Sequence, residues 1–345
     1  MKGIGLSESL FSEVVRPLLQ RLFPELLDNI SAAILGDGSE VLGYDDEISR
    51  DHNFSPRVVL FFEDETFDRV GSAVAEQLKS GLPGRHAGVE LLEHGGRSAL
   101  QVLPLPRHFL EYLGVAAMPA TPLDWLKYDE QRLLELTAGR VFHDPSGRLA
   151  ELRQRFGFFP EQVRLYLLRL AFVRMSECAG AERAVRRKDL VALRLYAGHF
   201  SYFAIKAAHL LERRYCPYHK WMARSLQGLG ETGRKMHELV AALLSAATPE
   251  AARTGFLDVL ELLGARVTDE LGVSRPGPHD PEGGVFLGFD WSAVTGPLKD
   301  RLPEELKDLS PVISPPRFLG FVFDYTGYDA RYEDMLAANL GFLRE

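Results

Sequence analysis

The chain has 345 residues, 46% of them hydrophobic and 26% charged, a composition typical of globular proteins and long enough for two domains. Its net charge of -8 argues against general attraction to nucleic acid, so we expect no nucleic-acid partner. Two cysteines, Cys178 and Cys216, and the lack of any long uncharged apolar run favour a cytoplasmic protein without a disulfide framework or a membrane segment. We expect a monomer or a homodimer.

The first 120 residues alternate between helical and strand patterns. The expected helices are 6–27 and 64–79, and the expected strands are 32–35, 58–62, 86–92 and 99–103. The run at 58–62 is wholly apolar, which predicts a strand that is buried on both faces. This order of elements predicts a small α/β domain with a mixed sheet at residues 1–120.

The pattern changes after Pro122, and from residue 131 onward nearly every segment has a helical period. The longest expected helix covers 188–214, where apolar residues recur in steps of three and four. We therefore predict an all-α helical bundle domain at 121–275. The remaining residues, 276–345, are expected to form a C-terminal extension that packs on the helical domain.

The segment 35–53, between the first two expected strands, carries the residues best suited to chemistry. Gly36 and Gly38 lie in a turn, where glycine lets backbone N–H groups converge on an anion without a Cβ in the way. Asp51 and Asn53 are two residues apart, so in an extended segment both side-chain oxygens can reach one metal ion. The segment therefore predicts a site for a triphosphate and its Mg²⁺.

These residues resemble the signature of the nucleotidyltransferase superfamily, in which Gly-Ser precedes a carboxylate-x-carboxylate pair. Here eleven residues separate Gly38-Ser39 from Asp51-His52-Asn53. The longer string 38–52 is similar to bacterial nucleotidyltransferase-like proteins whose C-terminal half is a helical domain of unknown function. The similarity extends over about residues 30–230 and includes Asp124-Trp125-Leu126 and the run Arg213-Arg-Tyr-Cys-Pro-Tyr-His-Lys-Trp221.

The resemblance implies a nucleotidyltransferase-type α/β domain followed by a helical domain that closes over the nucleotide. The implied reaction is Mg²⁺-dependent transfer of a nucleoside monophosphate from a nucleoside triphosphate, with ATP expected, to a hydroxyl of a small molecule or macromolecule. Gly38 and Ser39 would bind the phosphates, and Asp51 and Asn53 would hold Mg²⁺. Glu90 is the candidate for a third carboxylate on a neighbouring strand, because it interrupts an apolar run; a solvated sheet face is the alternative.

Asn53 departs from the superfamily pattern, which has Asp or Glu at this position. An amide oxygen can bind Mg²⁺ but carries no charge, and Mg²⁺ gives up water reluctantly without anionic ligands. This leaves a second hypothesis: a catalytically weakened or inactive nucleotide- or partner-binding protein on the same fold. The acidic residues at 45–47 could supply the lost charge, or could form a solvated turn.

The run 213–221 is the second candidate cluster. Arginine and lysine donate to phosphate oxygens, and tyrosine or tryptophan rings can stack on a base. Tyr218 and Lys220 are therefore the expected nucleotide contacts. The alternative is a structural turn with Trp221 in the core. Cys216 and His219 have no matching second pair of ligands, so the sequence predicts no zinc site.

Overall fold

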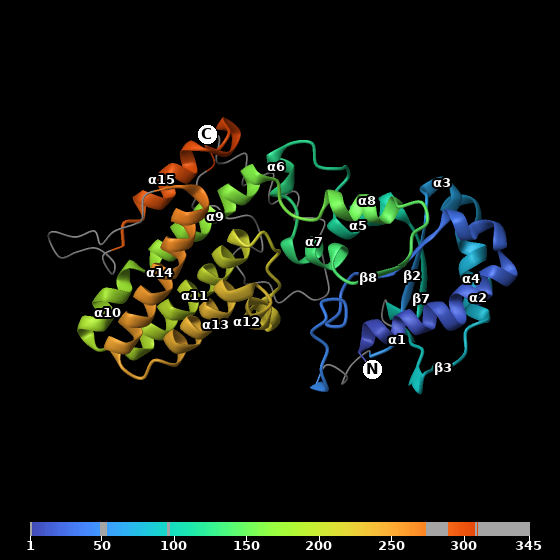
Figure 1. The fold of residues 1–345 in the computed structure, drawn as a ribbon, viewed down its shortest axis with the longest axis horizontal. Coiled ribbons are helices and arrows are strands. Elements are labelled where there is room, and N and C mark those ends of the chain that lie inside the picture. The colour runs from blue at the N-terminus through green and yellow to red at the C-terminus, as the bar shows by residue number, and fades with distance from the viewer. Residues whose placement is uncertain (1, 49–53, 95–96, 274–288, 308, 310–345) are drawn as a thin grey trace. The chain divides into compact units, whose positions relative to one another are not determined.

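The computed structural model describes residues 2–48, 54–94, 97–273, 289–307 and 309 (Figure 1). The chain divides into two compact units. The first consists of Met1–Met118 and Arg132–Gly157, and the second of Pro119–Gln131 and Phe158–Glu345. The first contains a small mixed sheet with helices and the second is mostly helical, which confirms the predicted fold class.

The sheet of the first unit has four strands in the order β7-β2-β1-β8. They are β7 (Leu100–Pro104), β2 (Val58–Phe62), β1 (Ser31–Ile34) and β8 (Arg140–His143). β2 is parallel to β7 and antiparallel to β1, and β1 is antiparallel to β8. All five residues of β2 are buried, as expected for an apolar strand that is covered on both faces.

Helices cover both faces of this sheet. The N-terminal helix comprises α1 (Gly3–Leu10), a π-helical turn (Phe11–Val15) and α2 (Arg16–Leu22), followed by a 3-10 turn (Pro24–Asn29). The crossover between the parallel strands β2 and β7 comprises α3 (Asp64–Thr66), a π-helical turn (Phe67–Gly71) and α4 (Ser72–Ser80). On the other face, α5 (Leu105–Leu113) lies near α8 (Arg148–Arg155) (Figure 1). Phe109 of α5 contacts the ring of Phe156, the residue that follows α8.

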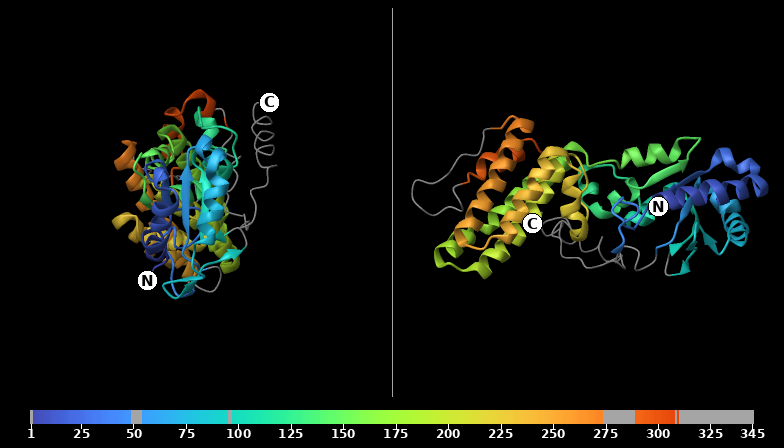
Figure 2. Two further views of the ribbon diagram at one scale, coloured as in Figure 1. Left: turned by 90° about the vertical axis from the view of Figure 1, so that its right-hand side faces the viewer. Right: turned by 60° about the horizontal axis from the view of Figure 1, so that its bottom comes forward.

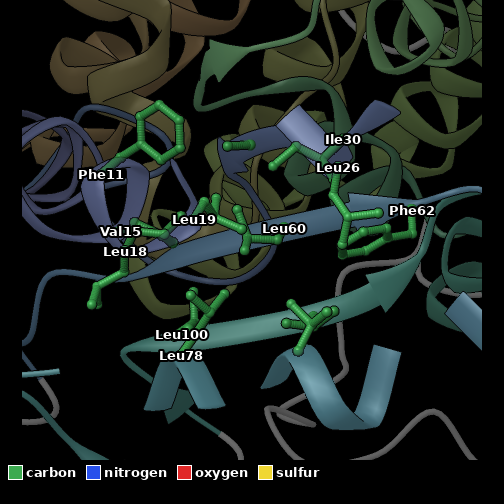
Figure 3. Close-up of a cluster of buried hydrophobic side chains, with 14 of the residues drawn as sticks. Phe11, Val15, Leu18, Leu19, Leu26, Ile30, Leu60, Phe62, Leu78 and Leu100 are labelled. Atoms are coloured by element: carbon green, nitrogen blue, oxygen red, sulfur yellow. The ribbon is translucent and has the colours of Figure 1, made fainter. Parts of the chain in front are cut away.

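The core of the first unit lies between β2 and the helices on one face. Figure 3 shows Leu60 and Phe62 of β2 close to side chains from the N-terminal helix, with Leu78 of α4 and Leu100 of β7 on the same face. Because side chains alternate along a strand, Val58, Leu60 and Phe62 face this core, and Val59 and Phe61 face α5.

Two parts of the first unit differ from the expectation. The expected strand at 86–92 is instead a hairpin of β3 (Arg85–His86) and β4 (Val89–Glu90), separate from the main sheet and beside a second short pair, β5 (Glu93–His94) and β6 (Arg97–Ser98). The sequence also places 132–157 in the helical domain, whereas the structure groups them with the first unit, because β8 pairs with β1. β8 has only two apolar residues, Val141 and Phe142, too few for a strand pattern.

The second unit is built from long helices that lie alongside one another (Figure 2). They are α9 (Glu161–Ser176), α10 (Ala181–Arg187), α11 (Leu190–Leu211), α12 (His219–Gln227), α13 (Gly230–Ser245) and α14 (Pro249–Leu271). A 3-10 turn (Glu177–Gly180) follows α9, and α6 (Pro122–Trp125) precedes α7 (Glu130–Thr137), which contains the division between the units. α11 packs against α9, α13 and α14 and is the centre of the bundle.

Within the expected C-terminal extension, the described residues form α15 (Ser292–Asp300) and α16 (Glu304–Lys307). α15 packs against α9, and Phe289 stacks on Phe172 of that helix at 6.5 Å between ring centroids. The aromatic run and the terminal helix expected beyond residue 310 lie outside the described residues. Among the helices that the structure describes, none has the length and apolar character needed to cross a membrane.

Candidate functional site

The glycine turn follows directly from the end of β1. Gly36 and Gly38 have φ angles of 90° and 134°, in the region that glycine adopts without strain. A Cβ at position 38 would overlap the carboxylate of Glu40, which would have to move, so the backbone conformation is the main requirement for glycine there. The turn then closes like a single helical turn, in which the Leu42 N–H donates to the Gly38 carbonyl at 3.4 Å and the Tyr44 N–H donates to the Ser39 carbonyl at 2.8 Å.

Three successive N–H groups begin this turn. Those of Gly38, Ser39 and Glu40 donate to no backbone carbonyl within the described part of the chain. Gly38 and Ser39 are half-buried, so these groups are near the surface. Consecutive N–H groups at a glycine turn form a concave anion site, which is the chemistry that the sequence predicts for Gly38 and Ser39.

The turn is held from behind by residues of the α7–β8 region. The Gly36 N–H donates to the Glu135 carbonyl at 2.9 Å, and the Gly139 N–H donates to the Val41 carbonyl at 3.0 Å. The Tyr112 hydroxyl donates to the Glu135 carboxylate at 2.6 Å. Burial, together with the adjacent Glu135, raises the pKa of Tyr112 well above its usual value, so this hydroxyl remains protonated. Hydrogen bonds therefore hold the turn at both Gly36 and Val41.

Arg57, the residue before β2, connects this strand to the glycine turn. Its Nε donates to Glu40 Oε1 at 3.2 Å, and its Nη2 donates to the Asp37 carbonyl. Its own N–H donates to the Ser7 hydroxyl at 3.0 Å. Arg57 is 7% exposed, so it brings a buried positive charge to the turn, balanced by Glu40 and Asp37.

The two predicted metal ligands, Asp51 and Asn53, lie outside the described residues. The described chain resumes at Phe54, three residues before Arg57. Within the described part of the chain, no group of three or more His, Cys, Asp or Glu side chains could hold a metal ion. Asp45 has a structural role, because its buried carboxylate accepts the Gly3 N–H at 2.9 Å at the start of α1, whereas Asp46 and Glu47 are exposed.

Glu90 is exposed on the separate β3–β4 hairpin, not on a strand next to β2. The parallel neighbour of β2 is β7, whose only polar residue is Gln101. Gln101 is the pairing partner of Val59 and lies between Leu100 and Val102, which face the core, so its side chain faces the opposite side. On that side, the parallel neighbour of β2 therefore presents a neutral amide and no carboxylate.

The run 213–221 in the second unit is organised by a buried ion pair. Lys206 of α11 contacts Glu130 of α7 at 2.5 Å, and the two side chains are 6% and 11% exposed. Glu130 also accepts the backbone N–H of Cys216 at 2.7 Å. Burial alone would lower the pKa of Lys206, but the adjacent Glu130 outweighs it and the net pKa is raised, so the ammonium stays charged.

The predicted nucleotide contacts lie next to this pair. The Tyr218 N–H donates to Gln131 Oε1 at 2.9 Å, which places the half-buried Tyr218 at the start of α12. Lys220 is exposed, with its Nζ 5.0 Å from the ring centroid of Trp221. Trp221 is only 6% exposed, as the structural alternative requires. The turn thus presents Tyr218 and Lys220 beside a buried tryptophan.

The sequence alone did not single out Arg57, Gln101 or Glu130. Arg57 directly precedes an apolar strand, and Gln101 interrupts one. A polar residue at such a position is visible in the sequence, but many polar residues at strand positions are simply exposed to solvent. Glu130 lies 76 positions from Lys206, and no periodicity connects residues at that separation. Only the folded structure brings these groups to their partners.

Comparison with known proteins agrees with part of the expectation. Residues 125–222 match the family model described as "Domain of unknown function (DUF4037)". No curated protein matches the chain. A solved structure described as a nucleotidyltransferase-like protein from Exiguobacterium sibiricum is 12% identical; the match covers 73% of this chain and 75% of that one, with a TM-score of 0.32. Over residues 125–222, the chain is thus similar to proteins that carry this domain of unknown function.

Proposed function

We propose that the first unit binds a nucleoside triphosphate at the glycine turn and that the chain is a Mg²⁺-dependent nucleotidyltransferase. The observation that carries this proposal is the row of N–H groups at Gly38, Ser39 and Glu40, which have no backbone acceptor among the described residues. Arg57 supports it, because this arginine brings the start of β2 against the same turn. The residues just before β2, including Asp51 and Asn53, are those that the resemblance assigns to the metal.

Mg²⁺, when bound, would neutralise the phosphates and stabilise the charge that develops as a nucleoside monophosphate moves to a hydroxyl. Asp51 would be its anionic ligand, and Asn53 and Gln101 could offer neutral oxygens. The backbone at Gly38 and Ser39 would orient the β- and γ-phosphates. Glu40 and Asp37 already balance the charge of Arg57, so the turn has little net positive charge to attract a triphosphate. We therefore expect triphosphate binding to depend on the metal.

A non-catalytic nucleotide- or partner-binding protein on the same fold is the second candidate. Gln101 favours it, because the strand parallel to β2 carries this neutral amide and no carboxylate, and Asn53 is a neutral amide as well. A site with one carboxylate binds Mg²⁺ weakly. Under this hypothesis a nucleotide would bind without turnover, and its binding would not require Mg²⁺.

Thermal shift of the full chain with ATP, GTP, CTP and UTP, each with and without Mg²⁺, tests the first part of the proposal. A nucleotide present at 100 times its Kd should raise the free energy of unfolding by about 2.7 kcal/mol, and should do so only when Mg²⁺ is present. Asp51→Asn should abolish this shift, whereas Asp28→Asn, at an exposed position away from the turn, should retain it. A shift that persists without Mg²⁺ would favour the non-catalytic candidate.

Turnover of labelled ATP with a panel of hydroxyl-bearing acceptors tests the second part. If the site is a weakened enzyme, Asn53→Asp and Gln101→Glu should each raise turnover, because each adds a carboxylate for the metal. Glu90→Gln tests whether Glu90 or residue 101 is the third ligand of the metal. The change should leave turnover unaltered if the third ligand is at position 101, and should lower turnover if the exposed Glu90 is that ligand. No turnover in any variant would exclude the enzyme.

A further inference from the structure

The first unit has a small pocket at the end of the sheet away from the glycine turn. β1 and β2 are antiparallel, with Ser31 opposite Phe61, so the start of β1 and the end of β2 meet at one edge. The glycine turn follows the end of β1, at the other edge. The pocket has a volume of about 160 Å³, and its lining includes Ser31, Phe61, Thr66, Arg69, Ser146 and Arg148.

This edge is the one where the two parallel strands end. β2 ends at Phe62 and β7 at Pro104, paired in parallel register. In open α/β sheets, ligands bind in the crevice outside the carboxyl ends of the parallel strands. The loops that leave β2 and β7 both contribute to the pocket, so its position is that of a ligand site.

Two arginines give the pocket an excess of positive charge. Arg148 is held in place by Glu63, at 3.1 Å from its Nε, and by Glu151, at 2.7 Å from its Nη1. Arg69 makes no hydrogen bond or ion pair with any residue that the structure describes. Among the described residues that line the pocket, Glu63 is the only one with a carboxylate. The guanidinium of Arg69 is therefore available to bind an anion.

The size and the hydroxyl groups of the pocket restrict which anion can bind. An apolar cavity of about 150 Å³ holds a benzene molecule, so a pocket of this size takes about six non-hydrogen atoms. The hydroxyls of Thr66 and Ser146 make no hydrogen bond to other described side chains and can donate to oxygen. Ser31 already donates to Asp144, at 2.7 Å, and lies at the buried end of the lining.

We propose that this pocket binds a small oxyanion, with inorganic phosphate the best match, through Arg69 and Arg148. A phosphate ion has five non-hydrogen atoms and accepts bidentate hydrogen bonds from a guanidinium. The site lies at the opposite end of β1 and β2 from the glycine turn and does not depend on the function proposed there.

Thermal shift and calorimetric titration of the full chain with sodium phosphate, against sodium chloride at equal ionic strength and without Mg²⁺, test the proposal. We expect a saturable shift, with Kd raised about tenfold by Arg69→Gln, because one charge-assisted hydrogen bond is lost. Arg148→Gln should have a similar effect. Arg155→Gln, an exposed arginine on the same helix as Arg148, is the matched control and should bind as the unmodified chain does.

Arg69 is the decisive position, because its lack of partners means that Arg69→Gln should not destabilise the fold, whereas Arg148→Gln breaks contacts with Glu63 and Glu151. Sulfate and acetate titrations show whether the site prefers a tetrahedral or a planar anion; both are small oxyanions, and saturation by either supports the proposal. The absence of saturation with all three anions overturns it. So does a shift that survives Arg69→Gln but is lost in Ser39→Ala, because the anion would then be at the glycine turn.

Discussion

Breaking the buried pair of Lys206 and Glu130 should destabilise the second unit strongly. In Lys206→Met, the carboxylate of Glu130 stays buried, at 11% exposure, without the ammonium that was 2.5 Å away. Removing one member of a buried pair typically costs about 3–5 kcal/mol, because the other charge is left uncompensated. For a unit of about 200 residues, this corresponds to a fall in Tm of about 6–20 °C.

Urea denaturation followed by circular dichroism, with calorimetry for Tm, measures this cost. Glu130→Gln keeps an oxygen for the Cys216 N–H but leaves Lys206 unpaired, and should cost a similar amount. The double variant Lys206→Met/Glu130→Gln should cost less than the sum of the two single changes, since neither charge remains buried. Lys235→Met is the control, because Lys235 and Glu238 form an exposed pair at 3.6 Å, worth about 1 kcal/mol or less. A cost for Lys206→Met as small as that of the control, or strict additivity in the double variant, would refute the reasoning.

Three further predictions concern other buried positions. Burial lowers the pKa of His209 to about 4, below the unfolded value of about 6.5. The unfolded chain therefore takes up a proton first as pH falls, and we expect unfolding free energy to drop by about 3 kcal/mol between pH 6.5 and 4; urea titrations of His209→Gln should show a smaller drop. Arg169→Met should raise the unfolding free energy by about 1–4 kcal/mol, because Arg169 Nε and Nη1 are buried without a hydrogen-bond partner among the described residues; a loss would contradict this. Gly139→Ala should lower the Tm of the first unit sharply, since its Cβ would overlap the Ile34 carbonyl, whereas Gly147→Ala, also at positive φ but with open space around it, should cost only about 1 kcal/mol.

Local patterns in the sequence predict the elements that interact mainly with their neighbours. The apolar run at 58–62 is β2, and the stripe within 188–214 is α11, because burial of these side chains determines both elements. The glycine turn also follows from local chemistry, since Gly36 and Gly38 adopt the positive φ angles expected of glycine.

Long-range pairing explains what the sequence does not predict. β8 becomes a strand because β1 offers it an unpaired edge, and its four residues, Arg140–His143, have no strand pattern of their own. Likewise, β7 could be expected as a strand, but not as the parallel neighbour of β2, so the sequence does not single out Gln101. Register across a sheet depends on which strands meet, and a single sequence carries little information about that.

The division of the chain has a practical consequence for work with fragments. The backbone passes from one unit to the other three times, after Met118, after Gln131 and after Gly157. A fragment that stops at residue 120 would lack β8 and leave β1 as a bare edge, open to pairing with other molecules. Isolation of the α/β unit therefore calls for an internal splice that retains Arg132–Gly157, because simple truncation would yield an aggregation-prone product.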